Sequence, residues 1–345
     1  MERYEHGGDI YGNPGVTLDF SVNINPLGLP DAVREALVTR VDEYTRYPDQ
    51  HYRALRTAIA GHEAVPEEMV LCGNGAADLI YRICYALQPR RALIPSPTFS
   101  EYEKALTQVG CLVTDYMMTV ENGLAITDGI LEKIVPGIDV LFLCHPNNPT
   151  GLLIHTDLLE RILNRTRETG TTVVVDECFL DFKYGNSTKR YLSDIPRLVI
   201  LKAFTKMYAM AGLRLGYLLT GDEMLLRRIT DAAQCWSVSV PAQIAGVAAI
   251  SCEGWQIETR RLVAEESRFF TESLNRLGIT VFPSDANFLL LRSDVPLCEP
   301  LLQKGILIRS CENFKGLDNT YFRIGVKTRV ENSRLIQAIE EILYG

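Results

Sequence analysis

The middle of the chain alternates short apolar runs with stretches in which apolar residues recur at helical spacing. The runs are rich in β-branched residues and show no polar alternation, which is typical of parallel strands buried on both faces. This order predicts an α/β fold with a mostly parallel sheet covered by helices on both faces. Strands are expected at 69–72, 91–94, 140–144, 172–175 and 198–201, and helices at 76–86, 99–109 and 158–169.

The two ends of the chain have other patterns. A long helix is expected over 255–277, because Val263, Phe270 and Leu274 fall on one face and Gly278 fits its C-terminal stop. Short strands at 279–282, 287–291 and 322–326 and a final helix from Asn332 complete a small α+β domain. The first part is rich in glycine and proline. We therefore expect an N-terminal arm at 1–45, a large domain at 46–245 and a small domain at 246–345.

Composition and charge narrow the class of protein. The 345 residues carry 35 Lys and Arg against 43 Asp and Glu, a net charge of −8. Without a basic cluster, this charge disfavours nucleic acid and anionic membranes as partners. The chain has no long apolar run and no signal-peptide pattern. Nine cysteines without a C-x-x-C pair, and five scattered histidines, predict reduced thiols in a cytoplasmic protein and no metal site.

Two glycine- or asparagine-containing turns follow predicted strands. Residues 73–78 read Gly-Asn-Gly-Ala-Ala-Asp, and such a turn lets backbone N–H groups reach a phosphate at a helix N-terminus. Asp78 breaks the dinucleotide-binding fingerprint, so a simple tight turn is an equal alternative. Residues 147–151 read Asn-Asn-Pro-Thr-Gly, which is either turn chemistry or a polar ligand site.

Charged residues follow two further strands. Asp176 and Glu177 come directly after a buried run, where a carboxylate needs a partner. One could hold a cationic ring nitrogen, or the pair could cap a helix. Lys206 lies among Phe, Met, Tyr and Ala, with Arg214 eight residues on. Apolar surroundings disfavour the charged lysine and promote Schiff-base chemistry, although a lone lysine more often lies at the surface.

Because the four motifs all follow predicted strands, they are expected to meet at one edge of the sheet. A phosphate cradle, an acid for a ring nitrogen, an amide donor and an activated lysine are together what pyridoxal phosphate requires.

On these residues the chain resembles the fold-type I pyridoxal-phosphate enzymes, in the branch that contains the histidinol-phosphate aminotransferases. Within that branch it is similar to the threonine-phosphate decarboxylases of cobalamin biosynthesis. That narrower likeness rests on residues 6–8, 19–28, 236–238, 308–311 and 316–318. The resemblance covers nearly the whole chain. It implies a large cofactor-binding domain and a small α+β domain built from both chain ends.

The resemblance also implies roles for individual residues. Lys206 forms the Schiff base with the cofactor, Asp176 holds the pyridine nitrogen, Asn148 bonds the ring oxygen, and Phe99 stacks on the ring. The cofactor phosphate is expected to be held by Gly75, Ala76, Ala77, Thr205 and Arg214, and by Tyr47 of a neighbouring subunit, which implies a homodimer.

The implied substrate is a small anionic amino acid. Arg309 and Arg323 resemble the substrate-binding arginines, and Arg323 is expected to bind the carboxylate. Four residues near the N-terminus are expected to close over the substrate: His6, Gly7, Gly8 and Asn25.

Two reactions fit these residues. The first is decarboxylation of O-phospho-L-threonine to (R)-1-amino-2-propanol phosphate. The alternative is transamination of histidinol phosphate or an aromatic amino acid with 2-oxoglutarate. A cofactor-sensing regulator and a nicotinamide oxidoreductase are disfavoured, the first by the acidic charge and the second by Asp78. The chain departs from the family pattern at Lys202, at Phe179, where aminotransferases often have Tyr, and at Ala203, where Ser or Thr is usual.

Overall fold

The centre of the fold is a seven-stranded sheet. A computed structural model of the chain describes residues 6–183, 185 and 187–345. In chain order the strands of this sheet are β2 (Val70–Gly73), β3 (Arg91–Ser96), β4 (Leu112–Met117), β5 (Val140–Cys144), β6 (Thr172–Asp176), β7 (Leu198–Ala203) and β8 (Gly216–Thr220). The order across the sheet is β2-β8-β7-β6-β5-β3-β4. All neighbours are parallel except that β8 runs antiparallel to β2 and β7, which confirms the mostly parallel sheet.

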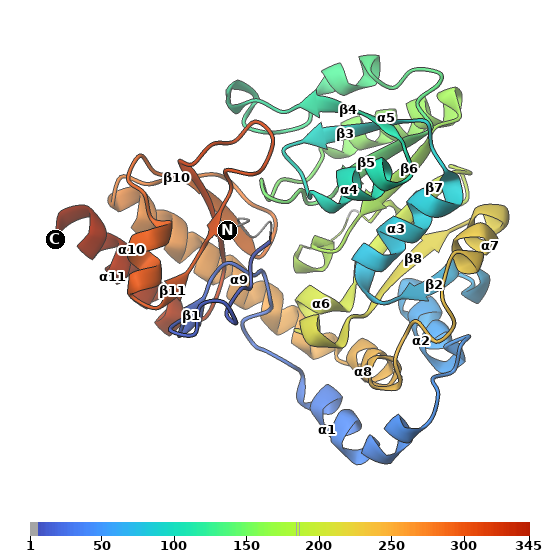
Figure 1. Cartoon of the computed structure of the whole chain (residues 1–345), viewed down its shortest axis with the longest axis horizontal. Helices are drawn as coiled ribbons and strands as arrows, with labels where there is room; N and C mark the ends of the chain where they lie inside the picture. The colour runs from blue at the N-terminus through green and yellow to red at the C-terminus, as the bar shows by residue number, and fades with distance from the viewer. Residues whose placement is uncertain (1–5, 184, 186) are drawn as a thin grey trace.

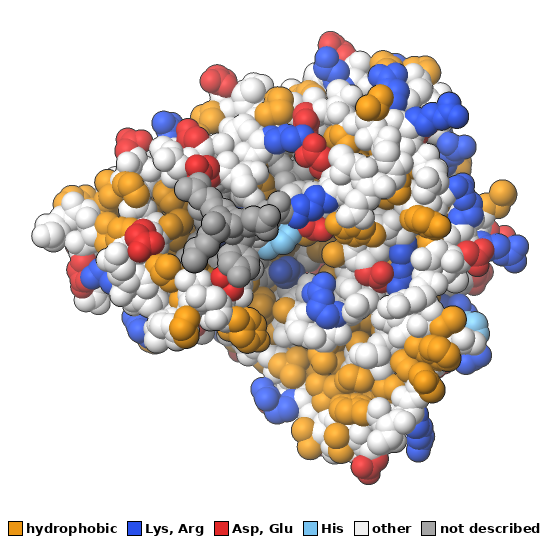
Figure 2. Space-filling view, in the orientation of Figure 1, with side chains coloured by type: hydrophobic (Ala, Val, Ile, Leu, Met, Phe, Trp, Pro, Cys, Tyr) orange, Lys and Arg blue, Asp and Glu red, His pale blue; other side chains and the backbone are white. Residues whose placement is uncertain are grey.

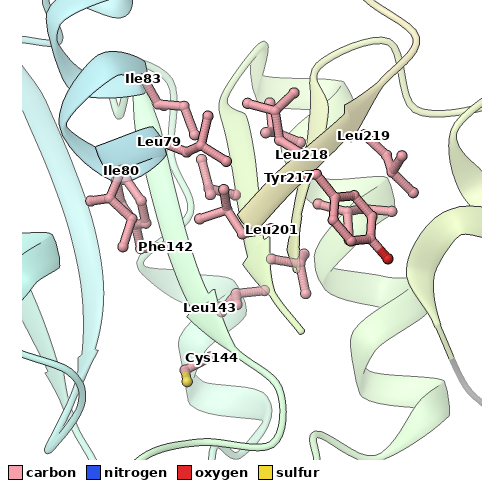
Figure 3. Close-up of a cluster of buried hydrophobic side chains, with 14 of the residues drawn as sticks. Leu79, Ile80, Ile83, Phe142, Leu143, Cys144, Leu201, Tyr217, Leu218 and Leu219 are labelled. Carbon is pink, nitrogen blue, oxygen red and sulfur yellow. The ribbon is translucent and has the colours of Figure 1, made fainter. Parts of the chain in front are cut away.

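Helices cover this sheet, as the sequence pattern predicts (Figure 1). The helices of this part of the chain are α2 (Arg53–Glu63), α3 (Gly75–Leu87), α4 (Glu101–Gln108), α5 (Thr156–Thr169), α6 (Phe204–Met207), α7 (Glu223–Asp231) and α8 (Val240–Ile250), of which α6 and α8 lie beside the sheet and do not cover it. Figure 3 shows Leu79, Ile80 and Ile83 of α3 beside Phe142 and Leu201 of the sheet. Every residue of β5, β6 and β7 is buried. Burial on both faces explains why these strands read as unbroken apolar runs.

A second, smaller sheet carries its own apolar core. Its strands β9 (Thr280–Val281), β10 (Phe288–Arg292), β12 (Arg309–Ser310) and β13 (Tyr321–Gly325) are antiparallel in the order β12-β13-β10-β9. The long helix α9 (Glu253–Arg276) and the helices α10 (Cys298–Gln303) and α11 (Arg329–Tyr344) contribute to this core. Near the N-terminus, β1 (Leu18–Asp19) pairs with β11 (Ile306–Leu307), so both chain ends meet here (Figure 1).

Some elements lie where the sequence pattern gave no expectation. The helix α1 (Asp31–Thr39) lies within the glycine- and proline-rich arm. The predicted boundary at residue 245 falls inside α8, whose buried residues join the first core, and we propose to place it after this helix. Short 3-10 helices occur at Val41–Thr45, Glu67–Met69, Val120–Asn122, Asp128–Glu132, Leu180–Phe182, Thr188–Tyr191 and Ala211–Leu213. Within the part of the chain that the structure describes, none of the helices combines the length and the apolar character needed to cross a membrane.

A buried ionic network joins α2 to the sheet. Glu63 is 2% exposed and accepts hydrogen bonds from the Lys202 ammonium at 2.8 Å, the Lys189 ammonium at 2.9 Å and the Tyr217 hydroxyl. Lys202 also lies 3.1 Å from Asp181. Burial alone would raise the pKa of Glu63, but the charge and hydrogen bond of Lys202 outweigh it and lower the pKa to about 2. Lys202, which departs from the family pattern, is thus the ion-pair partner of Glu63 and Asp181.

We expect Lys202→Met to destabilise the fold by about 3–5 kcal/mol, because it leaves a buried carboxylate with incomplete compensation. The midpoint of urea denaturation measures this loss. The matched control is Lys304→Met, which breaks a 2.7 Å pair with Glu341 at the surface and should cost under about 1 kcal/mol. Equal losses from the two variants would contradict the role of the network.

Candidate active site

A cavity of about 550 Å³ lies at the carboxyl ends of the parallel strands. Strand-end residues of the large sheet form one wall, as expected for ligand sites in open α/β folds. Arginines of the second sheet form the facing wall. Predicted site residues that line it are His6, Gly7, Ala76, Ala77, Phe99, Asn148, Asp176, Thr205, Lys206, Arg214, Arg309 and Arg323.

Lys206 reaches the cavity from α6, directly after β7. Burial lowers its pKa, and the positive charges of Arg323 and Arg214 lower it further, to about 8. The neutral amine, which is the nucleophilic form of lysine, is therefore far more populated near physiological pH than in an ordinary lysine. The local sequence around Lys206 does not reveal that these two arginines help to lower its pKa.

Asp176 ends β6 with its carboxylate fixed by two donors. The Tyr102 hydroxyl donates to Oδ2 at 2.6 Å, and the Cys178 backbone N–H donates to Oδ1 at 2.9 Å. Tyr102 is fully buried and stacks on Phe142, with ring centroids 5.0 Å apart. The carboxylate is thus held in one orientation at the cavity wall, where it can hold a cationic nitrogen.

Glu177 turns away from this cavity. It is fully buried and accepts hydrogen bonds from the Ser187 hydroxyl and from both the backbone and the hydroxyl of Thr188. Burial raises the pKa of Glu177. The two neighbouring acids, which the sequence alone did not separate, therefore have different surroundings.

The N-terminus of α3 faces the cavity and is built for close approach. Gly75 has φ +84, and a Cβ there would lie 2.7 Å from Nη2 of Arg214. No side chain caps the first turn of α3, whose early N–H groups lack helical partners. Ala76, Ala77 and Thr205 line the cavity beside them. This arrangement of N–H groups, a hydroxyl and a guanidinium suits a phosphate.

The two adjacent asparagines after β5, Asn147 and Asn148, have different roles. Asn147 bonds the Pro97 carbonyl at 3.0 Å and the Thr150 hydroxyl at 3.0 Å, so it stabilises the turn. Asn148 lines the cavity, and its Oδ1 accepts a hydrogen bond from Arg323. This contact uses the amide oxygen, so the amide nitrogen of Asn148 can still donate a hydrogen bond.

Arg309 and Arg323 are opposite each other in the register of β12 and β13. Arg323 also donates to the Ser21 carbonyl at 2.8 Å, and its buried Nε has no hydrogen-bond partner. Burial lowers the pKa of Arg323 to about 10. Arg309 donates to Asn313 at 2.7 Å. The second sheet therefore places two guanidinium groups at the cavity, a pairing suited to an anion.

Four further predicted residues do not line the cavity. Gly75 lies behind Arg214, and the Gly8 N–H donates to the Ser21 hydroxyl at 2.8 Å. Asn25 donates to the Met207 carbonyl at 2.6 Å and to Thr259 at 2.7 Å, so it fixes the arm to the segment after Lys206.

Tyr47 is the fourth of these residues. It is 79% exposed and packs against Trp236 with ring centroids 4.6 Å apart. Tyr47 therefore does not line the cavity of its own chain.

Several cavity residues were not predicted. Tyr102 lies three residues after Phe99, a helical spacing that could have suggested a shared role. Cys178 and Lys315 also line the cavity, and nothing in their local sequence indicated this. Phe179 and Ala203, the two remaining departures, line it as well. Phe179 packs edge-on against Phe288, with centroids 5.0 Å apart, so it is a packing residue without a hydroxyl to offer.

Comparison with known proteins agrees with this arrangement. The chain belongs to the family described as "Aminotransferase class I and II", whose sequence pattern matches residues 16–339. It is accordingly a pyridoxal-phosphate-dependent enzyme with the fold-type I architecture.

Particular relatives narrow the likeness. The chain is 41% identical to a threonine-phosphate decarboxylase of Salmonella typhimurium, over 99% of this chain and 97% of that protein. Its structure is similar to L-threonine-O-3-phosphate decarboxylase from Porphyromonas gingivalis, with a TM-score of 0.85, 28% identity and coverage of 95% and 100% of the two chains. It is also similar to histidinol-phosphate aminotransferase from Clostridium acetobutylicum, with a TM-score of 0.89, 28% identity and coverage of 94% and 99%.

Proposed function

We propose that this enzyme decarboxylates O-phospho-L-threonine and releases CO2 and (R)-1-amino-2-propanol phosphate, in cobalamin biosynthesis. The observation that carries the proposal is the convergence of Lys206, Asp176, Arg309 and Arg323 on one cavity. An amine, an acid and two guanidinium groups suit a cofactor with a cationic ring and a substrate with two anionic groups. The 41% identical decarboxylase supports the choice of substrate.

The residues present fit pyridoxal phosphate. Its phosphate would lie at the N-terminus of α3, beside Thr205 and Arg214, whose guanidinium can approach the helix because Gly75 has no side chain. Asp176 would hold the ring nitrogen, Phe99 would lie against the ring, and Asn148 would donate to its oxygen. When bound, the cofactor supplies an electron sink for the bond that breaks at the substrate Cα.

The protein's own groups would handle the substrate and its proton. Arg323, with its unpartnered Nε, would bind the carboxylate, and Arg309 would add a second positive charge. Lys206, with its pKa near 8, can take or deliver a proton at Cα. His6 and Gly7 would cover the substrate from the N-terminal segment, which limits the access of water.

Product analysis tests the proposal. Holoenzyme is incubated with O-phospho-L-threonine, and release of CO2 and of the phosphorylated amine is measured. A parallel reaction contains histidinol phosphate and 2-oxoglutarate, because the likeness to a histidinol-phosphate aminotransferase at a TM-score of 0.89 favours transamination as the second candidate. Turnover only in the parallel reaction would reject the decarboxylase proposal.

We propose further that the enzyme is a cytoplasmic homodimer. Exposed apolar side chains occur along and after α1, at Val38, Val41 and Tyr44, and Tyr47 packs against the exposed Trp236. Figure 2 shows hydrophobic side chains gathered on the lower part of this face, where Figure 1 places α1. Such a patch is typical of a subunit interface. The nine free cysteines suit a reducing compartment.

Subunit mixing tests the position of Tyr47. Tyr47→Ala and Lys206→Ala homodimers are both expected to be impaired. A mixed dimer should regain activity, because one of its cavities then has Lys206 from one subunit and Tyr47 from the other. If Tyr47 served its own subunit, mixing would restore nothing. Co-expression with two affinity tags isolates the mixed dimer for the rate measurement.

A further inference from the structure

Carboxylates stand at the rim of a cavity that is otherwise suited to anions. Glu101, Glu103 and Asp115 all line it, from α4 and β4. Figure 2 shows acidic and basic side chains side by side around the hollow in the middle of this face. Negative charge at this place would repel a substrate that carries both a carboxylate and a phosphate. The neutralisation of these acids therefore bears directly on the choice of substrate.

Lys315 forms ion pairs with two of them and offsets half of their negative charge. Its ammonium lies 2.6 Å from Glu103 and 2.8 Å from Asp115. Asp115 is fixed from the other side by the Ser96 hydroxyl at 2.6 Å. Burial opposes the charge of Lys315, but its hydrogen bonds with Asp115 and Glu103 raise the pKa of the ammonium. The lysine is therefore charged throughout the physiological range.

The position of Lys315 separates it from the groups that hold the cofactor. It lies in the loop between β12 and β13, whereas its partners belong to α4 and β4 of the large sheet region. The same loop contributes Asn313, which accepts a hydrogen bond from Arg309. Lys315 could therefore act as an anchor for the loop or as a neutralising charge, and these two roles predict different results.

We propose that Lys315 is a specificity-determining residue that offsets the negative charge of Glu103 and Asp115 at the cavity and so admits phosphate-bearing substrates. The proposal rests on the proposed function only in that the substrate carries a phosphate group. With Lys315 in place, the three charges sum to −1, and without it the rim carries two unpaired carboxylates. Their repulsion acts over the Debye length and is therefore removed by salt.

The test is the affinity of the holoenzyme for O-phospho-L-threonine, followed by the visible absorbance of the bound cofactor. For Lys315→Met we expect about tenfold weaker binding at about 0.01 M salt, and a difference within about twofold at about 1 M salt, where the Debye length is near 3 Å. L-Threonine lacks the phosphate, so the variant should bind it within about twofold of the wild type.

A variant without all three charges distinguishes the two roles. Lys315→Met combined with Glu103→Gln and Asp115→Asn changes the net charge of this cluster from −1 to 0, so it should bind the phosphorylated ligand at least as tightly as the wild type does. Lys304→Met, which breaks a surface pair of similar exposure with Glu341, a pair that does not line the cavity, should change nothing. If the triple variant binds as weakly as Lys315→Met at both salt concentrations, Lys315 is an anchor and the neutralising role is overturned.

Failure of the proposed reaction has a different signature. Binding of O-phospho-L-threonine without CO2 release would reject the decarboxylase and leave the salt-dependent result intact. Histidinol phosphate then serves as the phosphate-bearing probe in the same series. If Lys315→Met binds every phosphate-bearing ligand as the wild type does, the proposal is wrong.

Discussion

Lys206→Ala is expected to lower turnover by about 10⁴-fold or more, since it removes one amine with two roles. The proposed roles are attachment of the cofactor and transfer of a proton at Cα, and general acid–base catalysis alone commonly contributes 10²–10⁴-fold. CO2 release under saturating substrate measures the loss. Lys206→Arg is the matched variant, because it keeps the positive charge but offers no neutral amine. It should be as inactive as Lys206→Ala, and substantial activity of either variant would contradict the assignment.

The lowered pKa of Lys206 gives this prediction a pH dependence. The pKa of Lys206 is lowered from the ordinary lysine value of 10.5 to about 8 in the folded protein. Its neutral fraction therefore grows as pH rises through 8. We expect the rate at which the apoenzyme attaches pyridoxal phosphate to rise up to about tenfold per pH unit below 8 and to level off above it. Arg323→Met removes a neighbouring positive charge and should move the midpoint upward. A midpoint that stays in place would show that Arg323 does not contribute to the lowered pKa of Lys206.

The sequence pattern predicted the strands in which every residue is buried. The strands β5, β6 and β7 are buried on every residue, and that burial is what an unbroken apolar run records. The edge strand β4 was missed because its residues are mostly half-exposed or exposed, Leu112 to 72%. The direction of β8 could not be predicted either, since a short buried run is the same in parallel and antiparallel strands.

The site residues that follow strands could be predicted from the sequence, but the contacts between residues far apart in the sequence could not. Asp176 and Lys206 each follow a strand, and the topology alone brings them to one edge. Which of the asparagines after β5 would face the cavity depended on the turn that Asn147 stabilises. The bond from Tyr102 to Asp176 spans 74 residues, and the pairing of Lys315 with Asp115 spans 200. Contacts at such separations leave no periodic signal in one sequence.

Asp176→Asn is expected to lower kcat by about 10²–10³-fold while leaving the fold intact. Asparagine keeps the shape of the side chain, and its oxygen can still accept from the Cys178 N–H. The Tyr102 hydroxyl can turn to accept from the new amide nitrogen. What is lost is the negative charge that would keep the cofactor ring nitrogen protonated, and loss of one well-placed electrostatic group in an active site commonly costs this much.

Two variants separate this charge effect from the loss of a hydrogen bond. Tyr102→Phe removes one donor to Asp176 but keeps the charge, so kcat should fall only about tenfold. Glu177→Gln changes a buried acid that faces Ser187 and Thr188 instead of the cavity, so kcat should stay near the wild-type value although stability falls.

The sharpest readout for Asp176 is the affinity of the apoenzyme for two ligands, pyridoxal phosphate and its analogue with carbon in place of the ring nitrogen. Asp176→Asn should weaken binding of the first and leave the second nearly unchanged, since the analogue has no nitrogen for the carboxylate to hold. Overall damage to the cavity would weaken both alike. Equal weakening would therefore assign Asp176 a structural role, whereas selective weakening ties its charge to the ring nitrogen.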